Sequence, residues 1–368
     1  MQFIDLQSQQ TRIRQSLDAR IAAILAHGRY VLGPEVDELE AKLAARTGAA
    51  HCISCASGTD ALVLGLRAMD IGPGDGIIVP AFTFVATAEA VILTGATPLF
   101  ADIDPRTFNI DPDSIRRILD APPPGVTIKG IIPVDLFGLP ADYDRINAVA
   151  DEHGLFVLED AAQSFGAEYK GRKACALSML AATSFYPAKP LGCYGDGGAV
   201  FTSDVALAAK LRSLRNHGAG TSQYDNVRVG TTSRLDSIQA AVLLSKLEIF
   251  DDELATRREL ARVYGERLAS TVTTPLVPAG HGSSWAQYSV LVDDRDAFVE
   301  SLRGRGIPTM VYYRTPLHLQ PAYAGLGYAR GDFPVAEAVS ERIVSLPMHP
   351  YLDESSVALV CDATEERQ

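Results

Sequence analysis

The chain has 368 residues, of which 47% are hydrophobic and 21% charged, and its formal net charge is −12 at pH 7. The hydrophobic fraction is that of a globular protein and excludes wholesale disorder. The acidic excess argues against non-specific binding to nucleic acid or to an anionic membrane surface. The length favours one large domain with a smaller companion.

Several features favour a cytoplasmic location. No run of apolar residues reaches the roughly 18–20 of a membrane span. Residues 1–10 lack the basic start and apolar stretch of a signal peptide. The five cysteines are an odd number scattered over a long chain, which is typical of reduced thiols. Cys52 and Cys55 form a CxxC pair, but no second Cys or His pair stands at metal spacing, so we expect no metal site.

From about residue 51 to residue 217, short β-rich segments alternate with helical patterns. We expect strands at 51–56, 76–80, 97–101, 130–134, 155–158, 182–185 and 199–202. We expect helices at 60–69, 85–93, 143–153 and 205–215. This alternation, with strands rich in Val and Ile, predicts an α/β fold with a mainly parallel sheet covered by helices.

The pattern changes after Ser233. Residues 240–250 and 253–268 are rich in Ala, Leu, Glu and Arg at helical period and predict one long helix or two in tandem. Beyond residue 272, we expect a strand at 285–292, a helix at 296–305, a strand at 309–313 and a closing pair of helices. We therefore divide the chain into a large domain, 1–250, and a small α+β domain, 251–368, on which an N-terminal helix at 10–26 packs.

Ser57-Gly58-Thr59-Asp60 lies between a predicted strand and a predicted helix. The start of a helix offers unpaired N–H groups and the positive end of a dipole, and a glycine lets an anion approach the backbone. These residues could therefore bind a phosphate. Ser, Thr and Asp are also common helix caps, which is the alternative interpretation.

Two carboxylates, Glu159 and Asp160, stand at the end of a buried apolar strand. In an open α/β sheet, ligands bind at the carboxyl ends of the strands. A buried aspartate there needs a cation or hydrogen-bond donors, and one facing a basic ring nitrogen would keep that nitrogen protonated. The alternative is that Asp160 caps the next helix.

A lysine follows the strand that ends at Ser184. Lys189 is flanked by Pro187, Pro190 and Gly192, so it lies on an ordered turn. A desolvated lysine amine can be neutral near pH 7 and can then form a Schiff base. The alternative is an ordinary solvated lysine.

Each of these signals is weak by itself, but together they match one cofactor. A phosphate cup, an aspartate for a ring nitrogen and an amine on an ordered loop are what pyridoxal phosphate requires. Their order along a parallel sheet is that of the aspartate-aminotransferase-like fold.

Motifs along nearly the whole chain resemble those of the sugar-nucleotide aminotransferases of DegT/StrS type. They are Phe3–Leu6, Gly33–Val36, Ser57–Leu62, Pro80–Thr87, Glu159–Gln163, Ser184–Lys189, Gly195–Gly198, Arg215–Gly218, Ser233–Asp236 and Gln239–Ala241. The resemblance implies a pyridoxal-phosphate-dependent transferase of fold type I. Such a fold has a mainly parallel seven-stranded sheet between helices and a smaller α+β C-terminal domain. It also implies a homodimer with shared active sites.

The resemblance assigns a role to each cofactor-binding residue. Lys189 would form the Schiff base with pyridoxal 5′-phosphate (PLP; PMP in its aminated form) and then move the proton between substrate and cofactor. Asp160 would hold the ring nitrogen, and Gln163 would bind the phenolic oxygen. Phe84 would stack on the cofactor ring. Gly58, Thr59 and Ser184 would bind the phosphate.

Two positions depart from the family pattern. The residue that reaches the phosphate from the neighbouring subunit is normally Asn and here is Thr232, whose hydroxyl can still donate. Where the family often has His-Tyr-Pro, this chain has Tyr312-Tyr313-Arg314. A histidine in place of Lys189, as in the dehydratase branch, would remove the Schiff base, so the lysine favours transamination.

Residues 175–178, 183–198 and 346–351 look closest to one branch of the family. Its members aminate UDP-2-acetamido-2-deoxy-3-oxo-glucuronate for surface polysaccharide, such as lipopolysaccharide or O-antigen. Arg234 would then pair with the uronate or the diphosphate, because a planar guanidinium matches a carboxylate. A structural salt bridge is its alternative role. The other expected substrate-binding residues are His217, Tyr312, Tyr313 and His318.

The expected function is the transfer of an amino group from L-glutamate to the 3-keto carbon of that nucleotide sugar. One alternative keeps the enzyme class but changes the substrate to a dTDP- or GDP-linked 3-oxo or 4-oxo deoxyhexose. A remote alternative is a non-catalytic binding protein on the same fold, against which the intact Lys189 and the lack of a basic N-terminal module argue. The nucleotide, the keto position, the stereochemistry of the amine and any assembly beyond a dimer stay open.

Overall fold

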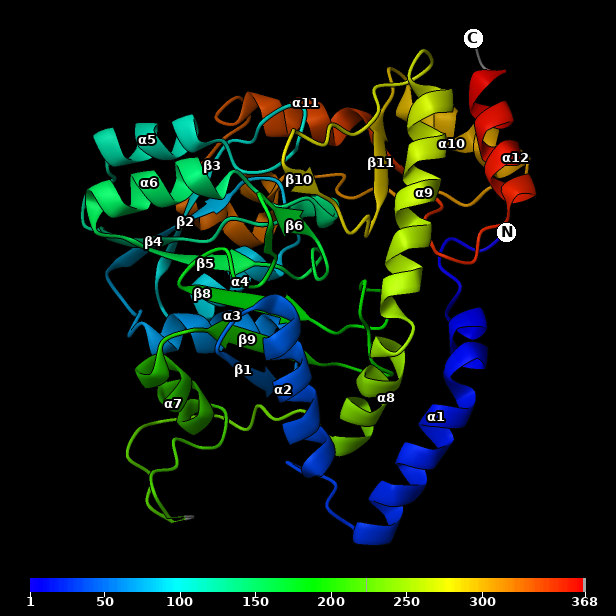
Figure 1. The fold of residues 1–368 in the computed structure, drawn as a ribbon. Helices are drawn as coiled ribbons and strands as arrows, with labels where there is room; N and C mark the ends of the chain where they lie inside the picture. Colours follow the sequence, from blue (N-terminus) through cyan, green and yellow to red (C-terminus); the bar gives the residue numbers. More distant parts are fainter. Residues whose placement is uncertain (223, 367–368) are drawn as a thin grey trace.

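The computed structural model describes residues 1–222 and 224–366 and has a seven-stranded sheet at its centre (Figure 1). The strand order is β1-β9-β8-β5-β4-β2-β3. The strands are β1 (His51–Cys55), β2 (Asp75–Pro80), β3 (Thr97–Ala101), β4 (Thr127–Ile131), β5 (Phe156–Asp160), β8 (Leu180–Ser184) and β9 (Gly198–Thr202). Within this sheet β9 runs antiparallel to both β1 and β8, and the other neighbouring pairs are parallel. The expected mainly parallel seven-stranded sheet is confirmed.

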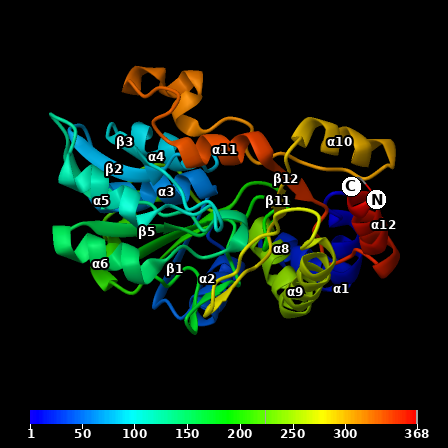
Figure 2. The ribbon, with the colours of Figure 1, turned by 90° about the horizontal axis from the view of Figure 1, so that it is seen from above.

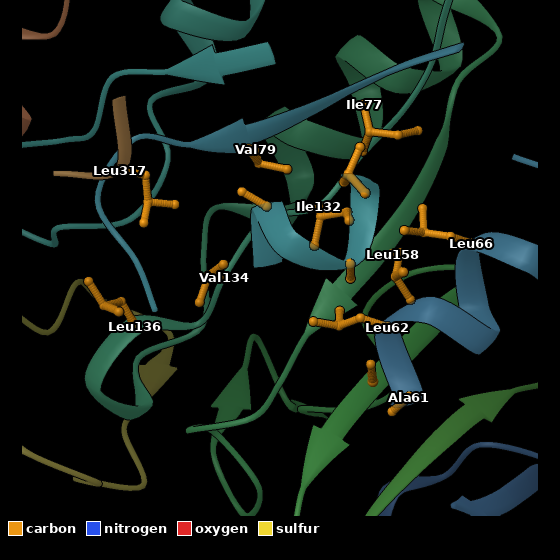
Figure 3. Packing of buried hydrophobic residues seen from close by; sticks show 14 of the residues in the cluster. Ala61, Leu62, Leu66, Ile77, Val79, Ile132, Val134, Leu136, Leu158 and Leu317 are labelled. Carbon is orange, nitrogen blue, oxygen red and sulfur yellow. The ribbon is translucent and has the colours of Figure 1, made fainter. Parts of the chain in front are cut away.

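Hydrophobic residues alternate between the two faces of the sheet, and helices cover both. In β2, Ile77 and Val79 pack in a cluster with α3 (Gly58–Ala68), whereas Ile78 packs with α5 (Pro112–Asp120) and α6 (Tyr143–His153). In the first cluster, Leu62 and Leu66 of α3 lie beside Leu158 of β5 (Figure 3). The other helices around the sheet are α2 (Pro34–Thr47), α4 (Ala86–Leu93), α7 (Val205–Leu214) and α8 (Ser237–Leu247). A strand that alternates in this way is held in one register, because a shift by one residue would reverse its faces.

The C-terminal part lies beside the sheet (Figure 2) and has a hydrophobic cluster of its own. Its strands β11 (Tyr288–Leu291) and β12 (Ile343–Leu346) pair antiparallel. Its helices are α9 (Phe250–Leu268), α10 (Arg295–Gly304), α11 (Pro334–Arg342) and α12 (Glu354–Glu365). Three short helical turns are η1 (Leu136–Gly138), η2 (Leu317–Leu319) and η3 (Pro321–Leu326). The short strands β6 (Glu168–Tyr169), β7 (Arg172–Lys173) and β10 (His281–Gly282) form a further sheet that joins the two parts. The division of the chain at residue 250 stays a prediction.

Three C-terminal and N-terminal features differ from the expectation. Residues 309–313 form no strand, and within them Met310 makes an isolated bridge to Ser345. Strand β12 lies between the two closing helices. The sequence pattern missed it because Ile343 directly follows α11 without a turn residue. The helix expected at 10–26 is α1 (Leu6–His27). It packs mainly along α8, and its Gln9 and Arg12 also contact Glu253 and Asp252 of α9 in the C-terminal part. No helix in the described residues is long and apolar enough to cross a membrane.

A buried ion pair joins α2 to the segment that follows α7. The Glu40 carboxylate pairs with the Arg215 guanidinium and accepts from the Ser54 backbone N–H at 2.9 Å and from the Ser54 hydroxyl at 2.8 Å. Arg215 also donates to the Ser54 carbonyl oxygen at 2.8 Å. Both charged side chains are buried, so each depends on the other for its solvation.

We therefore predict that Glu40→Ala lowers the free energy of unfolding by about 3–5 kcal/mol, because it leaves the Arg215 guanidinium buried without its counter-ion. Urea denaturation followed by circular dichroism measures the change. The matched control is Glu152→Ala, which removes the exposed partner of Arg116 and should leave the midpoint nearly unchanged. Equal midpoints for Glu40→Ala and the unmodified protein would contradict the prediction.

Candidate active site

A cavity of about 490 Å³ opens at the carboxyl ends of β5 and β8 and beside the N-terminus of α3. Nine of the residues predicted from the sequence line it: Gly58, Thr59, Phe84, Asp160, Gln163, Ser184, Lys189, Tyr312 and Tyr313. The parallel strands account for this convergence, because their carboxyl ends lie at the same edge of the sheet.

The N-terminus of α3 forms one side of the cavity. Ser57 caps this helix by accepting from the Asp60 N–H at 3.0 Å, and Gly58 stands at the first helical position. A Cβ on Gly58 would lie 2.6 Å from the Cβ of Ser184, so only glycine lets β8 approach the helix this closely. The free N–H groups of the first turn and the hydroxyls of Thr59 and Ser184 make a pocket suited to a phosphate.

Asp160 ends β5 and presents a buried carboxylate to the cavity. One of its oxygens accepts from the Thr87 hydroxyl at 2.8 Å, and the other accepts from the Ala162 N–H at 3.2 Å. Burial raises the pKa of this carboxyl, and the hydrogen bond from Thr87 opposes that rise. A cationic ring nitrogen would compensate the remaining cost of holding a charge here.

Gln163 is held with its amide N–H₂ group toward the cavity. Its side-chain oxygen accepts from the Phe137 N–H at 2.6 Å, and its backbone carbonyl accepts from the Ser284 hydroxyl at 2.7 Å. Its Nε2 lies 3.3 Å from the Tyr313 hydroxyl. With its oxygen engaged, the amide can act only as a donor to a ligand, which suits a phenolic oxygen.

Lys189 lies on a tight turn after β8. Its backbone N–H donates to the Tyr186 carbonyl at 2.9 Å, and a Cβ on Gly192 would lie 2.5 Å from the Pro187 carbonyl oxygen. No described residue makes a hydrogen bond or ion pair with the Lys189 Nζ. Burial lowers the pKa of this amine, and the charge of Asp160 opposes the shift. A lysine with a lowered pKa is a better nucleophile toward a carbonyl carbon.

Aromatic side chains form another part of the cavity lining. The Phe84 ring is 51% exposed although it lines the cavity, and it lies 6.2 Å from the ring of Tyr313. Tyr313 also packs edge-on against Phe82 at 5.9 Å. An apolar ring with one free face suits stacking against a flat heteroaromatic ligand.

These residues together fit pyridoxal phosphate. A cradle for the phosphate, an acid for the ring nitrogen, a donor for the phenolic oxygen, a ring face and a nucleophilic amine all face one cavity. Among the described residues no group of three or more His, Cys, Asp or Glu could hold a metal ion.

Three of the predicted residues form a separate exposed or half-exposed group outside the cavity. The Thr232 hydroxyl lies 2.7 Å from Nε2 of His217, and Arg234 donates to the Asn216 side chain at 2.8 Å. None of these residues, all of them described, lines the cavity of its own chain. Their predicted roles therefore require a second subunit and stay predictions.

The structure contradicts the substrate-binding role predicted for His318. Its side chain is fully buried, with Nε2 3.0 Å from a Glu337 carboxylate oxygen and its ring against Phe333. The short turn η2 directs it toward α11 and away from the cavity. The local sequence around His318 does not indicate this burial, because the contact joins η2 to Glu337 of α11, a separate element.

Several residues that line the cavity received no role from the sequence, among them Thr87, Tyr186 and Asp196 and the more distant Ile4 and Gln287. Thr87 and Asp196 lie inside motifs that were singled out, and Tyr186 lies in the lysine loop. Ile4 lies inside the Phe3–Leu6 motif, whose place beside the cavity was not foreseen, and Gln287 comes from a remote segment with no local signal.

Comparison with known proteins places these observations in one family. A family model described as the DegT/DnrJ/EryC1/StrS aminotransferase family matches residues 11–365. The chain is 50% identical to the UDP-2-acetamido-2-deoxy-3-oxo-D-glucuronate aminotransferase of Pseudomonas aeruginosa, over 99% of each chain. It is 41% identical to the dTDP-3-amino-3,4,6-trideoxy-alpha-D-glucose transaminase of Streptomyces venezuelae, over 99% of this chain and 95% of the other.

Solved structures agree with the sequence comparison. An aminotransferase of the same family from Brucella abortus superposes with a TM-score of 0.97 at 50% identity, over 100% of this chain and 99% of the other. NtdA from Bacillus subtilis with bound cofactor PMP superposes with a TM-score of 0.89 at 28% identity, over 100% and 83% of the two chains.

We predict that Thr87→Val weakens the binding of pyridoxal phosphate about tenfold, because a hydrogen bond to a charged group contributes roughly 1.5–3 kcal/mol. Without the hydroxyl, the pKa of Asp160 rises further and less of the carboxylate is ionised to meet the ring nitrogen. Absorbance titration of the cofactor-free protein measures the affinity. Thr87→Ser keeps the hydroxyl and serves as the control. Equal affinities for Thr87→Val and Thr87→Ser would contradict the role assigned to this hydrogen bond.

Proposed function

The chain belongs to the DegT/DnrJ/EryC1/StrS aminotransferase family, and we propose that its substrate is UDP-2-acetamido-2-deoxy-3-oxo-D-glucuronate. It is a pyridoxal-phosphate-dependent aminotransferase of fold type I. The observation that carries the activity is the amine of Lys189, which is free of protein partners among the described residues and shares the cavity with Asp160. The observation that supports the substrate is the 50% identity to the Pseudomonas aeruginosa enzyme over 99% of the chain.

The residues of this chain divide the chemical work. When bound, pyridoxal phosphate would supply an electron sink that makes the substrate carbon acidic enough to lose a proton. Asp160 keeps the ring nitrogen protonated, which sustains that sink. Lys189 accepts the proton at one carbon and returns it at another, and its lowered pKa suits it to act as a base. Gln163 orients the ring through its phenolic oxygen.

We also propose a homodimer that shares its active sites. Lys189 is the one cationic side chain among the described residues that line the cavity, whereas the proposed substrate carries a diphosphate and a carboxylate. Burying such anions without cations would cost binding energy. Arg234, Thr232 and His217 lie outside their own cavity and would meet these anions in the cavity of the partner.

Further parts of the proposal rest on the chemistry of the family. L-glutamate would be the amino donor. The enzyme would act in the cytoplasm, and its product would be used to build surface polysaccharide such as lipopolysaccharide or O-antigen. The alternative is a dTDP-linked keto-deoxyhexose, which the 41% identity to the Streptomyces venezuelae transaminase supports. That relative differs from the first in both nucleotide and sugar, so direct turnover decides between them.

We predict that, with L-glutamate, the purified protein aminates the UDP-linked 3-oxo-glucuronate at least tenfold faster than dTDP-linked 3-oxo or 4-oxo deoxyhexoses, because a matched anionic subsite discriminates strongly. Mass spectrometry of the products measures the transfer. Lys189→Ala is the control and should transfer nothing. Faster turnover of a dTDP substrate would reject the proposed sugar but not the enzyme class, whereas no turnover of any keto-sugar would reject both.

We predict that mixing inactive Lys189→Ala with weakly active Arg234→Ala restores activity to about a quarter of the unmodified level, because half of the randomly formed dimers then carry one intact site of two. The two variants are unfolded together, refolded as a mixture and assayed. Each variant refolded alone is the control. If the mixture is no more active than the average of the two controls, Arg234 does not act across a subunit interface.

A further inference from the structure

The N-terminal segment Gln2–Asp5 forms part of the wall of the catalytic cavity. Ile4 lines the cavity directly, and the Phe3 ring lies 6.4 Å from the ring of Tyr312, which also lines it. Figures 1 and 2 both place the N-terminus beside α12, at the C-terminal part of the chain. Residues that begin the chain thus reach the substrate end of the site, more than 300 positions away in sequence.

A buried histidine, His349, joins this segment to the C-terminal part by a hydrogen bond. His349 is 4% exposed, and its Nε2 lies 3.2 Å from the Gln2 carbonyl oxygen. Its Nδ1 lies 3.3 Å from the Tyr351 backbone N–H. Because that N–H can only donate, Nδ1 must be the acceptor, and the ring proton resides on Nε2 and is donated to Gln2.

Both ends of this connection are anchored by hydrogen bonds to neighbouring elements. On the histidine side, Arg257 donates to the Met348 carbonyl at 3.0 Å and Tyr264 donates to the Pro347 carbonyl at 3.1 Å. On the other side, Asp5 caps α1 by accepting from the Ser8 N–H at 2.9 Å. The segment between them is therefore held at two fixed points, with Phe3 and Ile4 in the span.

The surroundings of His349 favour its neutral form. Burial lowers the pKa of the imidazole, and the nearby Arg257 lowers it further, while Asp5 and the carbonyl of Gln2 oppose the shift. Tyr351, two residues after His349, donates a hydrogen bond from its hydroxyl to Glu253 of α9. Protonation of His349 would put a hydrogen on Nδ1, opposite the Tyr351 N–H, and Nδ1 could then no longer accept from that N–H.

We propose that His349 is a positioning residue that holds Gln2–Asp5 as a wall of the catalytic cavity through its hydrogen bond to the Gln2 carbonyl. This wall keeps Phe3 against Tyr312. Loss of the hydrogen bond from His349 would therefore make the substrate-binding end of the cavity less ordered, while Lys189 and Asp160 stay in place. The inference refines the site of the proposed function, and its first readout does not need the substrate.

The test compares His349→Leu, which cannot donate, with His349→Gln, whose amide can still donate to Gln2. In the holoenzyme, hydrogen exchange of residues 2–8 should become at least tenfold faster in His349→Leu and stay near the unmodified rate in His349→Gln. The KM for the keto-sugar should rise about fivefold in His349→Leu with a smaller change in kcat, because one hydrogen bond positions the wall. The cofactor absorbance spectrum should not change, and the exposed His153→Leu is the matched control.

The pH dependence gives a further readout with a defined sign. Because the pKa of His349 is lowered in the folded state, its contribution is complete above the unfolded-state value and is lost as the pH falls through the folded-state value. The opening of residues 2–8, measured as hydrogen exchange relative to the intrinsic rate at each pH, should therefore rise on acidification in the unmodified protein more than in His349→Gln.

Unchanged exchange and unchanged KM in His349→Leu overturn the inference. If that variant does not fold, Phe3→Ala takes its place: a raised KM with an unchanged cofactor spectrum supports the wall, and an unchanged KM overturns it. If no keto-sugar is turned over, the proposed function fails, and the hydrogen exchange of residues 2–8 still decides the inference.

Discussion

The burial of the Asp160 carboxylate is the constraint on which the rest of the site depends. An acid at the end of a fully buried strand cannot ionise without donors or a cation nearby. Thr87 and the Ala162 N–H supply two donors, and the ring nitrogen of a bound cofactor would supply the charge. Burial raises the pKa of Asp160 and lowers the pKa of Lys189. The environment that disfavours the charged carboxylate therefore also favours the neutral, nucleophilic form of the amine.

The sheet topology explains why these groups meet a phosphate pocket. Strand β9 runs antiparallel, so its first residue, Gly198, lies opposite both Cys55 at the end of β1 and Ser184 at the end of β8. A Cβ on Gly198 would lie 2.3 Å from the Ser57 carbonyl oxygen. The absence of a side chain there lets three strand ends converge below the first turn of α3, where an anion finds free N–H groups.

Local patterns predicted the parts of the fold and site that depend on one strand and the turn after it. The parallel core, Lys189, Asp160 and the α3 turn belong to this class, because strand period and turn residues are visible in a short window. Ile4 and Gln287 were missed, and His318 was misplaced, because their positions depend on contacts between remote segments. Strand β12 was missed for a related reason, since its pairing with β11 is what makes Ile343–Leu346 extended.

The net charge of −12 and the anionic cofactor and proposed substrate are compatible, because binding depends on local groups and not on the sum over the surface. The cofactor phosphate would be met mainly by N–H groups and hydroxyls at the start of α3, which add no charge. The anions of the proposed substrate would meet one lysine of the chain whose cavity they enter, and that lysine would be occupied at the reacting carbon. If Arg234 of a partner supplies the missing charge, a single subunit binds the cofactor well but the substrate poorly. Substrate binding and subunit association then stabilise each other by the same free energy.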